Sequence, residues 1–418
     1  MKIGIVGGGI AGLAAAWLLQ EHHQVTLFEQ QNRLGGHADA VEIEQDGEVA
    51  LIDTGFEFFF DSMFPRFNRL LALIGATVHR YPISATLYRA DHRRARLIPP
   101  YSREWFSWRA FHPCAIADLL LFQLVIARSA RLIEAADPFL TLEDYLRTLR
   151  LPERFKTNFL YPFLLAQWCV ELEEFKTFSA YNALKYTVMS RPTGFPPLSY
   201  GNEIVGGTRA YIAALETELT STQIHLSANI SAITNADGQF VLRDDHSGEY
   251  PFDRLIVATS APTARRLLQD LTGTEARRAA LGRIDYFTTT IAVHEDQRLM
   301  PANPAHWSVV NTRYDGTHSS NTIWKKWKSR KPIFRSWTTY DSVPPSPLHV
   351  VRTYEHPKVN LNYYRAQREL LSLQGEGNLW LAGLYMHDID CHESALVSAI
   401  NIARKLDPAS GNLQRLLE

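Results

Sequence analysis

The chain begins with a glycine-rich turn between two apolar stretches, and this turn limits the possible fold more than any other feature. Residues 3–6 are apolar, the next six read GGGIAG, and a stretch rich in Ala and Leu follows. A second apolar stretch, residues 25–28, ends at Glu29. The order of strand, tight turn, helix, strand and acidic residue is typical of a parallel α/β sheet that binds a dinucleotide.

Each residue type in the turn has a physical reason to be there. Gly7 allows the tight turn, Gly9 lets backbone amides approach a pyrophosphate, and Gly12 lets the helix pack close to the strand. The first amide groups of the helix, those of Ile10 and Ala11, present a partial positive charge to that anion.

Glu29 lies 17 residues beyond Gly12, where its carboxylate can accept hydrogen bonds from both ribose hydroxyls. A negative charge there disfavours a 2′-phosphate, so NADP is not expected. The chain continues QQNRLGGH, an arginine and a glycine pair directly after the acidic residue. A plain NAD-binding protein has no need of these residues at this point, so the run argues against simple NAD binding.

Composition limits the partners. The chain has 418 residues, of which 46% are hydrophobic and 21% charged, and its formal net charge is −1. Such a chain has no general attraction to nucleic acid or anionic lipid. Three scattered cysteines argue against a disulfide framework and for a reducing compartment. With no visible signal peptide and no apolar run of ~18 residues, a cytoplasmic protein without a transmembrane segment is expected.

The glycine turn, Glu29 and the Arg33, Gly35, Gly36 run together resemble the large FAD superfamily of flavin amine oxidases, phytoene desaturases and protoporphyrinogen oxidases. The resemblance implies that Arg33 reaches the phosphates or ribose and that the glycine pair lets the chain pass close to the flavin. The stretch Asp53-Thr54-Gly55-Phe56 resembles the D-x-G element that follows there. The further positions that it assigns to the FAD site are Gln30, His37, Ile230 beside the adenine, Ala258 near the pyrophosphate, Gly383, His392, Glu393, Ser394 and Ala395.

The stretch HDIDCHES, residues 387–394, contains histidines, acidic residues and a cysteine, which raises the question of a metal. In the superfamily this loop follows a strand ending in Gly and precedes a helix whose N-terminus points at the flavin. Its backbone amides would stabilise negative charge on the reduced flavin. Helix capping is the second interpretation, and a metal site, which is not expected, is the third. Noncovalent FAD is expected, because amine oxidases with a cysteinyl link place that cysteine upstream of the strand.

The fold class predicted is α/β, with α+β character in the substrate part. A Rossmann-like FAD-binding domain would comprise residues 1–77, 201–284 and 358–418, and an interleaved substrate domain residues 78–200 and 285–357. Helices are predicted over 115–135, 141–146, 205–219 and 393–406, and strands over 224–233, 239–245, 253–262 and 378–386. Residues 101–133 are interpreted as a wall or lid of the substrate domain, with an interfacial membrane segment as the alternative.

Soft motifs along nearly the whole chain, among them TLEDYL, VGGTRAYIAAL and HESALVSA, resemble a narrower bacterial group. Its members are described as NAD/FAD-binding or amine oxidase-like and are often encoded beside cyclopropane-fatty-acid-synthase-like enzymes. Two departures fall in substrate-facing regions: Glu57 replaces an apolar residue, and residues 180–203 differ from the aromatic-rich stretch of the group. Many amine oxidases also hold a lysine near flavin N5, yet residues 285–296 contain none.

The predicted function is an FAD-dependent dehydrogenase, desaturase or oxidase acting on a hydrophobic substrate such as an acyl chain, an isoprenoid or an aromatic natural product. Glu57 is the candidate catalytic base, because phenylalanines on both sides would raise its pKa. The alternative is that Glu57 faces solvent. A flavin amine oxidase and a non-redox protein with structural FAD are the rival functions; peripheral membrane contact and the oligomeric state stay open.

Overall fold

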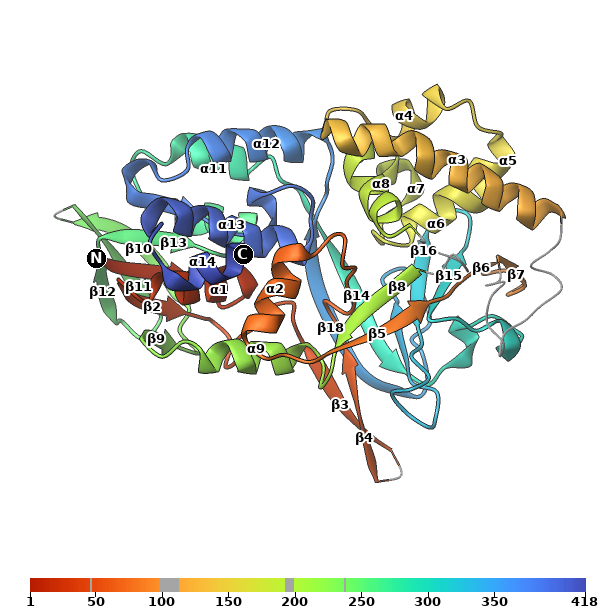
Figure 1. Ribbon diagram of the computed structural model, residues 1–418, viewed down its shortest axis with the longest axis horizontal. Coiled ribbons are helices and arrows are strands. Elements are labelled where there is room, and N and C mark those ends of the chain that lie inside the picture. Colours follow the sequence, from red (N-terminus) through yellow and green to blue (C-terminus); the bar gives the residue numbers. More distant parts are fainter. Residues whose placement is uncertain (46, 98–112, 192–198, 237) are drawn as a thin grey trace.

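The computed structural model describes residues 1–45, 47–97, 113–191, 199–236 and 238–418. One half of the molecule is built around a five-stranded parallel sheet, at the left of Figure 1. The strand order is β19 (Leu379–Leu381), β13 (Arg254–Val257), β1 (Lys2–Val6), β2 (Gln24–Phe28) and β9 (Thr222–His225). These strands come from both ends and the middle of the chain, so the domain is discontinuous.

Helices cover this sheet. All ten residues of α1 (Ile10–Leu19) are buried, because α1 lies against the sheet on one side and against α13 (His392–Leu406) on another. Its apolar composition all round is what such a position requires. The remaining helices of this half are α2 (Pro65–Leu73), α9 (Thr208–Thr217), α10 (Ala261–Leu267), α11 (Glu275–Leu281), α12 (Leu361–Ser372) and α14 (Gly411–Leu417).

A small antiparallel sheet lies beside the parallel one: β10 (Ile230–Ala236), β11 (Gln239–Asp244) and β12 (Glu249–Phe252). The single strand predicted over 224–233 is wrong. The extended conformation is interrupted at Ser227, which has a φ of 53°, and the strands before and after it join different sheets. A turn at this point lets β9 extend the parallel sheet while β10 begins the antiparallel one.

The other half contains a seven-stranded mixed sheet covered by helices, at the right of Figure 1. Its order is β18 (Leu348–Pro357), β14 (Tyr286–His294), β17 (Phe334–Trp337), β16 (Ser319–Ile323), β15 (Val310–Tyr314), β6 (Ala85–Arg89) and β7 (Ala95–Leu97). The covering helices are α3 (Pro113–Ala135), α4 (Leu142–Thr148), α5 (Glu153–Phe155), α6 (Tyr161–Leu165), α7 (Leu172–Phe175) and α8 (Ala180–Met189), with a π-helical turn at Lys156–Leu160.

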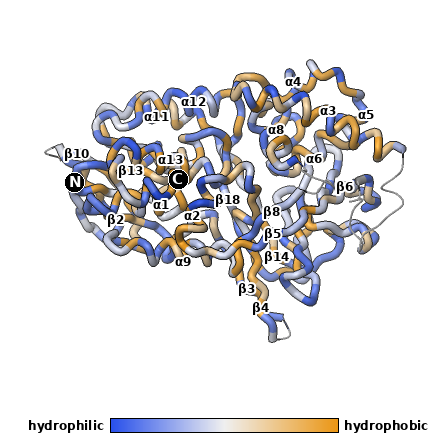
Figure 2. The backbone as a smooth tube through the Cα atoms, in the orientation of Figure 1, coloured by the Kyte–Doolittle hydropathy of each residue, from blue (hydrophilic) through white to orange (hydrophobic). Residues whose placement is uncertain are grey.

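Two strand pairs lie near the junction of the halves: β3 (Ala40–Gln45) with β4 (Glu48–Asp53), and β5 (Val78–Ile83) with β8 (Ser199–Ile204). Short 3-10 helices occur at Gln297–Leu299, Pro304–His306, Glu376–Asn378 and Leu384–Met386. Figure 2 shows hydrophobic and hydrophilic stretches alternating along the chain in both halves, and most of the buried apolar residues belong to one continuous cluster.

The predicted α/β class with an added mixed part is confirmed. The helix expected over 115–135 is present as α3, and Thr141 caps α4 by accepting a hydrogen bond from the Asp144 amide at 3.1 Å. The sheet pairing joins residues 85–97 to residues 286–357, as an interleaved second domain requires. The domain limits themselves stay a prediction. Residues 101–112 of the aromatic stretch lie outside the described part of the chain.

In the described part of the chain, none of the helices combines the length and the apolar character needed to cross a membrane.

Candidate functional site

The glycine turn after β1 has the geometry that the sequence indicated. Gly7 has a φ of 112°, and a Cβ atom on Gly12 would lie 1.9 Å from the Gly7 carbonyl oxygen. A Cβ on Gly9 would meet no atom within 4 Å, so the space beside Gly9 is open. Within the described residues, no hydrogen bond uses the amides of Ile10 and Ala11. The turn therefore offers free donors beside an open space, which fits a pyrophosphate.

Glu29 lies at the end of β2, directly beside this turn. Its two carboxylate oxygens accept hydrogen bonds from the amides of Gly8 at 2.7 Å and Gln31 at 2.8 Å. The side chain is buried and fixed in orientation, and each oxygen has a further lone pair for a ribose hydroxyl. Ser227 and Ala228 bond to the carbonyls of Gln31 and Glu29, which brings the chain leading to Ile230 close to Gln30.

The glycine pair docks onto the turn. The Gly35 amide donates to the Gly8 carbonyl at 2.8 Å, and a Cβ on Gly36 would approach Gly9 Cα to 3.4 Å. Both glycines have positive φ. Arg33 donates to the carbonyls of Leu34 and Gly36, so its guanidinium holds this loop together. Its expected contact with the cofactor phosphates stays a prediction.

The D-x-G element pairs with the segment after the glycine pair. The Thr54 amide donates to the Asp39 carbonyl at 2.9 Å, and the Phe56 amide donates to the His37 carbonyl at 3.1 Å. A Cβ on Gly55 would lie 2.0 Å from the same carbonyl oxygen, so the two segments can only meet at a glycine. Burial lowers the pKa of His37 to about 4, which makes its imidazole neutral.

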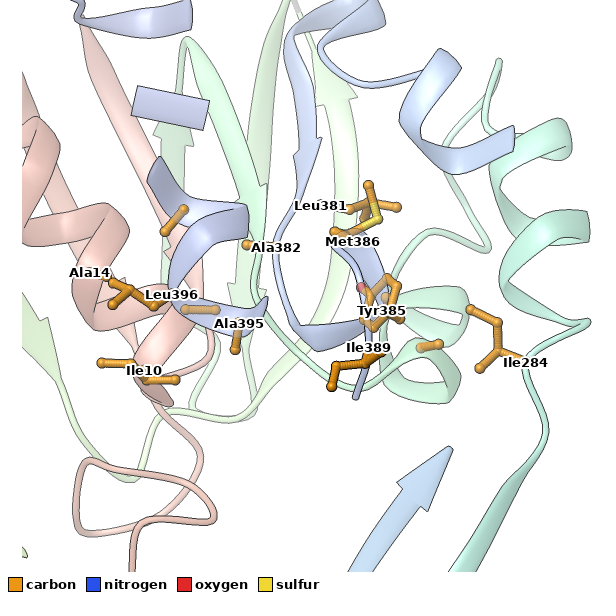
Figure 3. Packing of buried hydrophobic residues seen from close by; sticks show 14 of the residues in the cluster. Ile10, Ala14, Ile284, Leu381, Ala382, Tyr385, Met386, Ile389, Ala395 and Leu396 are labelled. Atoms are coloured by element: carbon orange, nitrogen blue, oxygen red, sulfur yellow. The ribbon is translucent and has the colours of Figure 1, made fainter. Parts of the chain in front are cut away.

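The C-terminal segment brings the last group of predicted residues to the same place. Gly383 has a φ of 143°, and its amide donates to the Ser398 hydroxyl at 2.9 Å. Figure 3 shows Ala395 and Leu396 at the start of α13 facing Ile10 and Ala14 of α1. Ala258, at the end of β13, donates to the Val6 carbonyl at 2.7 Å beside the glycine turn.

The first turn of α13 is capped from within the chain. Cys391 accepts hydrogen bonds from the Ser394 amide at its sulfur, 3.4 Å away, and from the Ala395 amide at its carbonyl, 3.3 Å away. Two amides expected to face the flavin therefore already have acceptors. The Glu393 carboxylate accepts from the amides of Arg66 and Phe67, both at 2.8 Å, and so caps α2. The cap of α13 is thus Cys391, whereas the carboxylate and histidine that the capping interpretation assigned to this helix end have other partners.

His392 belongs to an aromatic cluster rather than to a metal site. Its ring stacks on Phe56 with the centroids 4.2 Å apart, and its Nε2 lies 2.8 Å from the Tyr211 hydroxyl. Burial lowers its pKa to about 3. In the neighbouring loop, Asp388 pairs with Lys185, while burial raises the pKa of Asp390 well above its usual range. Among the described residues, no group of three or more His, Cys, Asp or Glu could hold a metal ion.

Glu57 has a setting different from the one expected. Its side chain is buried, but its nearest charged groups are Lys325 Nζ at 3.4 Å and Arg335 Nε at 3.6 Å. The flanking phenylalanines turn elsewhere: the Phe56 ring lies on His392, and the Phe58 and Phe60 rings contact each other. The expectation that apolar rings enclose the Glu57 carboxylate is wrong, because its partners come from distant segments. Exposure to solvent, the alternative, is wrong as well.

These groups belong to a buried ion cluster that we define as Glu57, Glu203, Lys325, Lys328 and Arg335. Lys325 Nζ lies 2.9 Å and Lys328 Nζ 3.3 Å from Glu203. Burial alone would raise the pKa of Glu203, but Lys325, a hydrogen bond from His79, and Lys328 lower it to about 2. Burial alone would lower the pKa of Lys325, but Tyr81, Glu57 and Glu203 outweigh it and raise that pKa.

Arg335 connects the cluster to the D-x-G element. Its guanidinium donates to the carbonyls of Thr54 at 2.9 Å and Gly55 at 3.3 Å. The sequence pattern did not single out Glu203 or Arg335 as site residues. Glu203 lies in the buried part of β8, in the strand sequence SYGNEI, whose polar residues gave no indication of burial.

A parallel sheet with a glycine turn after its first strand and a buried acidic residue at the end of the second is the arrangement typical of dinucleotide-binding proteins. The family model for flavin-containing amine oxidoreductases matches residues 10–332. The chain therefore belongs to this family of flavin-dependent oxidoreductases, and the predicted superfamily and enzyme class are confirmed.

Individual relatives are more distant. A carotenoid phi-ring synthase from Streptomyces griseus is 45% identical over 60 residues, which are 14% of this chain and only 12% of that protein. The structure of a CLA-producing fatty acid isomerase from P. acnes matches with a TM-score of 0.70 at 13% identity, covering 97% of this chain and 98% of that one. Cyclohexylamine oxidase from Brevibacterium oxydans IH-35A matches with a TM-score of 0.65 at 14% identity, covering 97% and 99%. The two structures show the common fold.

Proposed function

We propose that this protein is an FAD-dependent dehydrogenase, desaturase or oxidase that removes hydride from a C–H bond of a hydrophobic substrate. The observation that carries the proposal is the docking of the loop with Gly35 and Gly36 on the glycine turn, beside the open space at Gly9. The D-x-G element pairs with the segment that follows this loop, and the start of α13 faces α1. The family match supports a flavin as the cofactor of this site.

We propose noncovalent FAD. The amides of Ile10 and Ala11 would hold the pyrophosphate, and Glu29 would accept hydrogen bonds from the ribose hydroxyls. The flavin supplies hydride acceptance at N5. Cys391 is occupied as the cap of α13, and burial raises the pKa of its thiol to about 12, so it is a poor nucleophile for a covalent link.

Glu57 is the proposed proton acceptor, because it lies beside the D-x-G element and is connected to the surface through other charged groups. It is buried directly after Gly55 and Phe56, and it contacts Lys325. Lys325 contacts Glu203, which lies 2.9 Å from Nδ1 of His79, a side chain that is 45% exposed. The order Glu57, Lys325, Glu203, His79 forms a continuous row of charged and titratable groups from the buried carboxylate to the surface.

The hydrophobic substrate class rests on the second domain. Aromatic rings of the helical layer contact one another: the partly buried Phe122 contacts the buried Phe159 and the partly buried Phe163. Such a wall suits an acyl chain, an isoprenoid or an aromatic natural product better than a small polar amine. The short match to a carotenoid phi-ring synthase supports the same class.

Single-turnover flavin reduction tests the proposal. With an accepted substrate from a panel of acyl, isoprenoid and aromatic compounds, Glu57→Gln is expected to slow bleaching of the flavin by about 10²-fold or more. Wild-type bleaching by Glu57→Gln would remove Glu57 from the mechanism. A flavin that no substrate bleaches would favour the structural role of FAD.

Amine oxidation is the second candidate, because the matched family is named for it. β14 contains no lysine, and Lys325 is held between two carboxylates. Both observations weaken this candidate. Peroxide release over a panel of primary and secondary amines decides between the two functions.

A further inference from the structure

Helix α3 has an apolar stripe on its solvent side. Its buried face consists of Ala115, Val125, Ile126, Ser129 and Asp118, and it packs against α8. On the opposite face, large apolar side chains recur at intervals of four residues: Ile116 is 42% exposed, Leu120 66% and Leu124 41%. Pro113, Ala117 and Ala127 are exposed on the same face. We call this set the α3 stripe. Figure 1 shows α3 as the long helix of the helical layer, at the right of the view.

Charges around the stripe are arranged asymmetrically. Asp118, the acidic residue in the first four turns of α3, points inward and pairs with Arg96 at 2.7 Å. Beyond the stripe, Arg128 and Arg131 are exposed on the same side, and Glu134 follows in the last turn. An apolar surface that continues along the helix into two basic side chains, with the acidic side chain between its apolar residues turned inward, is complementary to an anionic lipid headgroup layer over hydrocarbon.

We propose that the α3 stripe binds the surface of an anionic phospholipid bilayer, with Leu120 entering the acyl boundary and the two arginines at the headgroups. The sequence that leads into α3, YSREWFSWR, has the mixed aromatic and basic composition of membrane interfaces. The formal net charge of −1 means that attraction to lipid has to be local rather than general. This surface lies on the substrate domain, and its function does not depend on which substrate the flavin oxidises.

Vesicle sedimentation with the cofactor-loaded full chain tests this proposal. Wild-type protein is expected to sediment with phosphatidylcholine vesicles that contain phosphatidylglycerol, and much less with phosphatidylcholine alone. Leu120→Glu is expected to lower the partition coefficient by about tenfold or more. Replacing Arg128 and Arg131 by Gln is expected to lower it by about fivefold for each arginine, and only on the anionic vesicles.

The matched control is Leu371→Glu on α12, where the leucine is 46% exposed on the other domain; it is expected to leave sedimentation unchanged. Flavin absorbance and melting temperature, measured on each variant, separate a surface effect from misfolding. Wild-type protein that stays in the supernatant with both vesicle types overturns the proposal. Two other results, each in the absence of vesicle binding, also overturn it. If wild-type protein is dimeric and Leu120→Glu is not, the stripe is assigned to a contact with a second copy of the chain. If Leu120→Glu instead lowers the melting temperature, the stripe is assigned to a contact with residues 98–112 of the same chain.

Discussion

Replacing Lys325 by Met tests the buried ion cluster, because it keeps the length of the side chain and removes its charge. Lys325 is 5% exposed at its side chain and lies 2.9 Å from Glu203 and 3.4 Å from Glu57. The surroundings of Glu203 hold its pKa at about 2 instead of 4.5, which corresponds to about 3 kcal/mol of folding stability at pH 7. His79 and Lys328 remain in the variant, but two buried carboxylates lose a partner. We expect a loss of about 2–4 kcal/mol.

The dependence on pH separates this cause from a packing defect. The folded pKa of Glu203 is lowered, so its contribution to stability is present above pH 4.5 and is lost as the pH falls towards 2. Urea unfolding in excess FAD, followed by near-ultraviolet circular dichroism, should therefore show a difference between variant and wild type that is large at pH 7 and smaller at pH 3. Arg330→Met, which removes an exposed partner of Glu48, should cost less than about 1 kcal/mol. A Lys325→Met loss below about 1 kcal/mol, or one independent of pH, would refute the reasoning.

Two further predictions concern the glycine turn and a buried histidine. Gly9→Ala places a methyl group in the open space beside the turn, so the protein should fold with wild-type stability yet lose about tenfold or more in FAD affinity, measured by flavin fluorescence. In the control variant Gly12→Ala, the added Cβ would meet the Gly7 carbonyl, so both stability and FAD affinity should fall. Undiminished FAD binding by Gly9→Ala would contradict the assignment. Burial, with smaller effects of His37 and Arg335, lowers the pKa of His356 to about 3. Folding stability is therefore expected to fall as the pH drops below 6.5, and this histidine alone should account for a loss on the order of 2 kcal/mol by pH 5. His356→Gln should make the free energy of unfolding, measured with urea, depend less steeply on pH in this range. An unchanged dependence would show that the imidazole of His356 takes up its proton in the folded protein as readily as in the unfolded one.

The nucleotide half of the fold could be predicted because its signals are local. The turn from Gly7 to Gly12, the strand ending at Glu29 and the helix starting at His392 are each determined by neighbours in the sequence. The break at Ser227 could not be predicted, since it depends on β9 and β10 joining different sheets.

The surroundings of Glu57 were missed for a related physical reason. Its partners, Lys325 and Arg335, lie more than 250 residues away along the chain and come from the second domain. Neighbouring phenylalanines indicate an apolar site only when their rings turn towards the carboxylate, and here long-range packing turns them away. The partners of the Glu393 side chain could not be predicted from its neighbours in the sequence either, because they are amides of the distant helix α2.

The visible absorption spectrum of the purified protein, recorded before and after heat release of any chromophore, tests the central claim most directly. Bands near ~370 and ~450 nm that move from the protein to the supernatant are the predicted result, and they would identify a noncovalent flavin. A colourless protein that still binds NAD would contradict the account, because the free amides beside Gly9 and the docked glycine pair would then serve another dinucleotide.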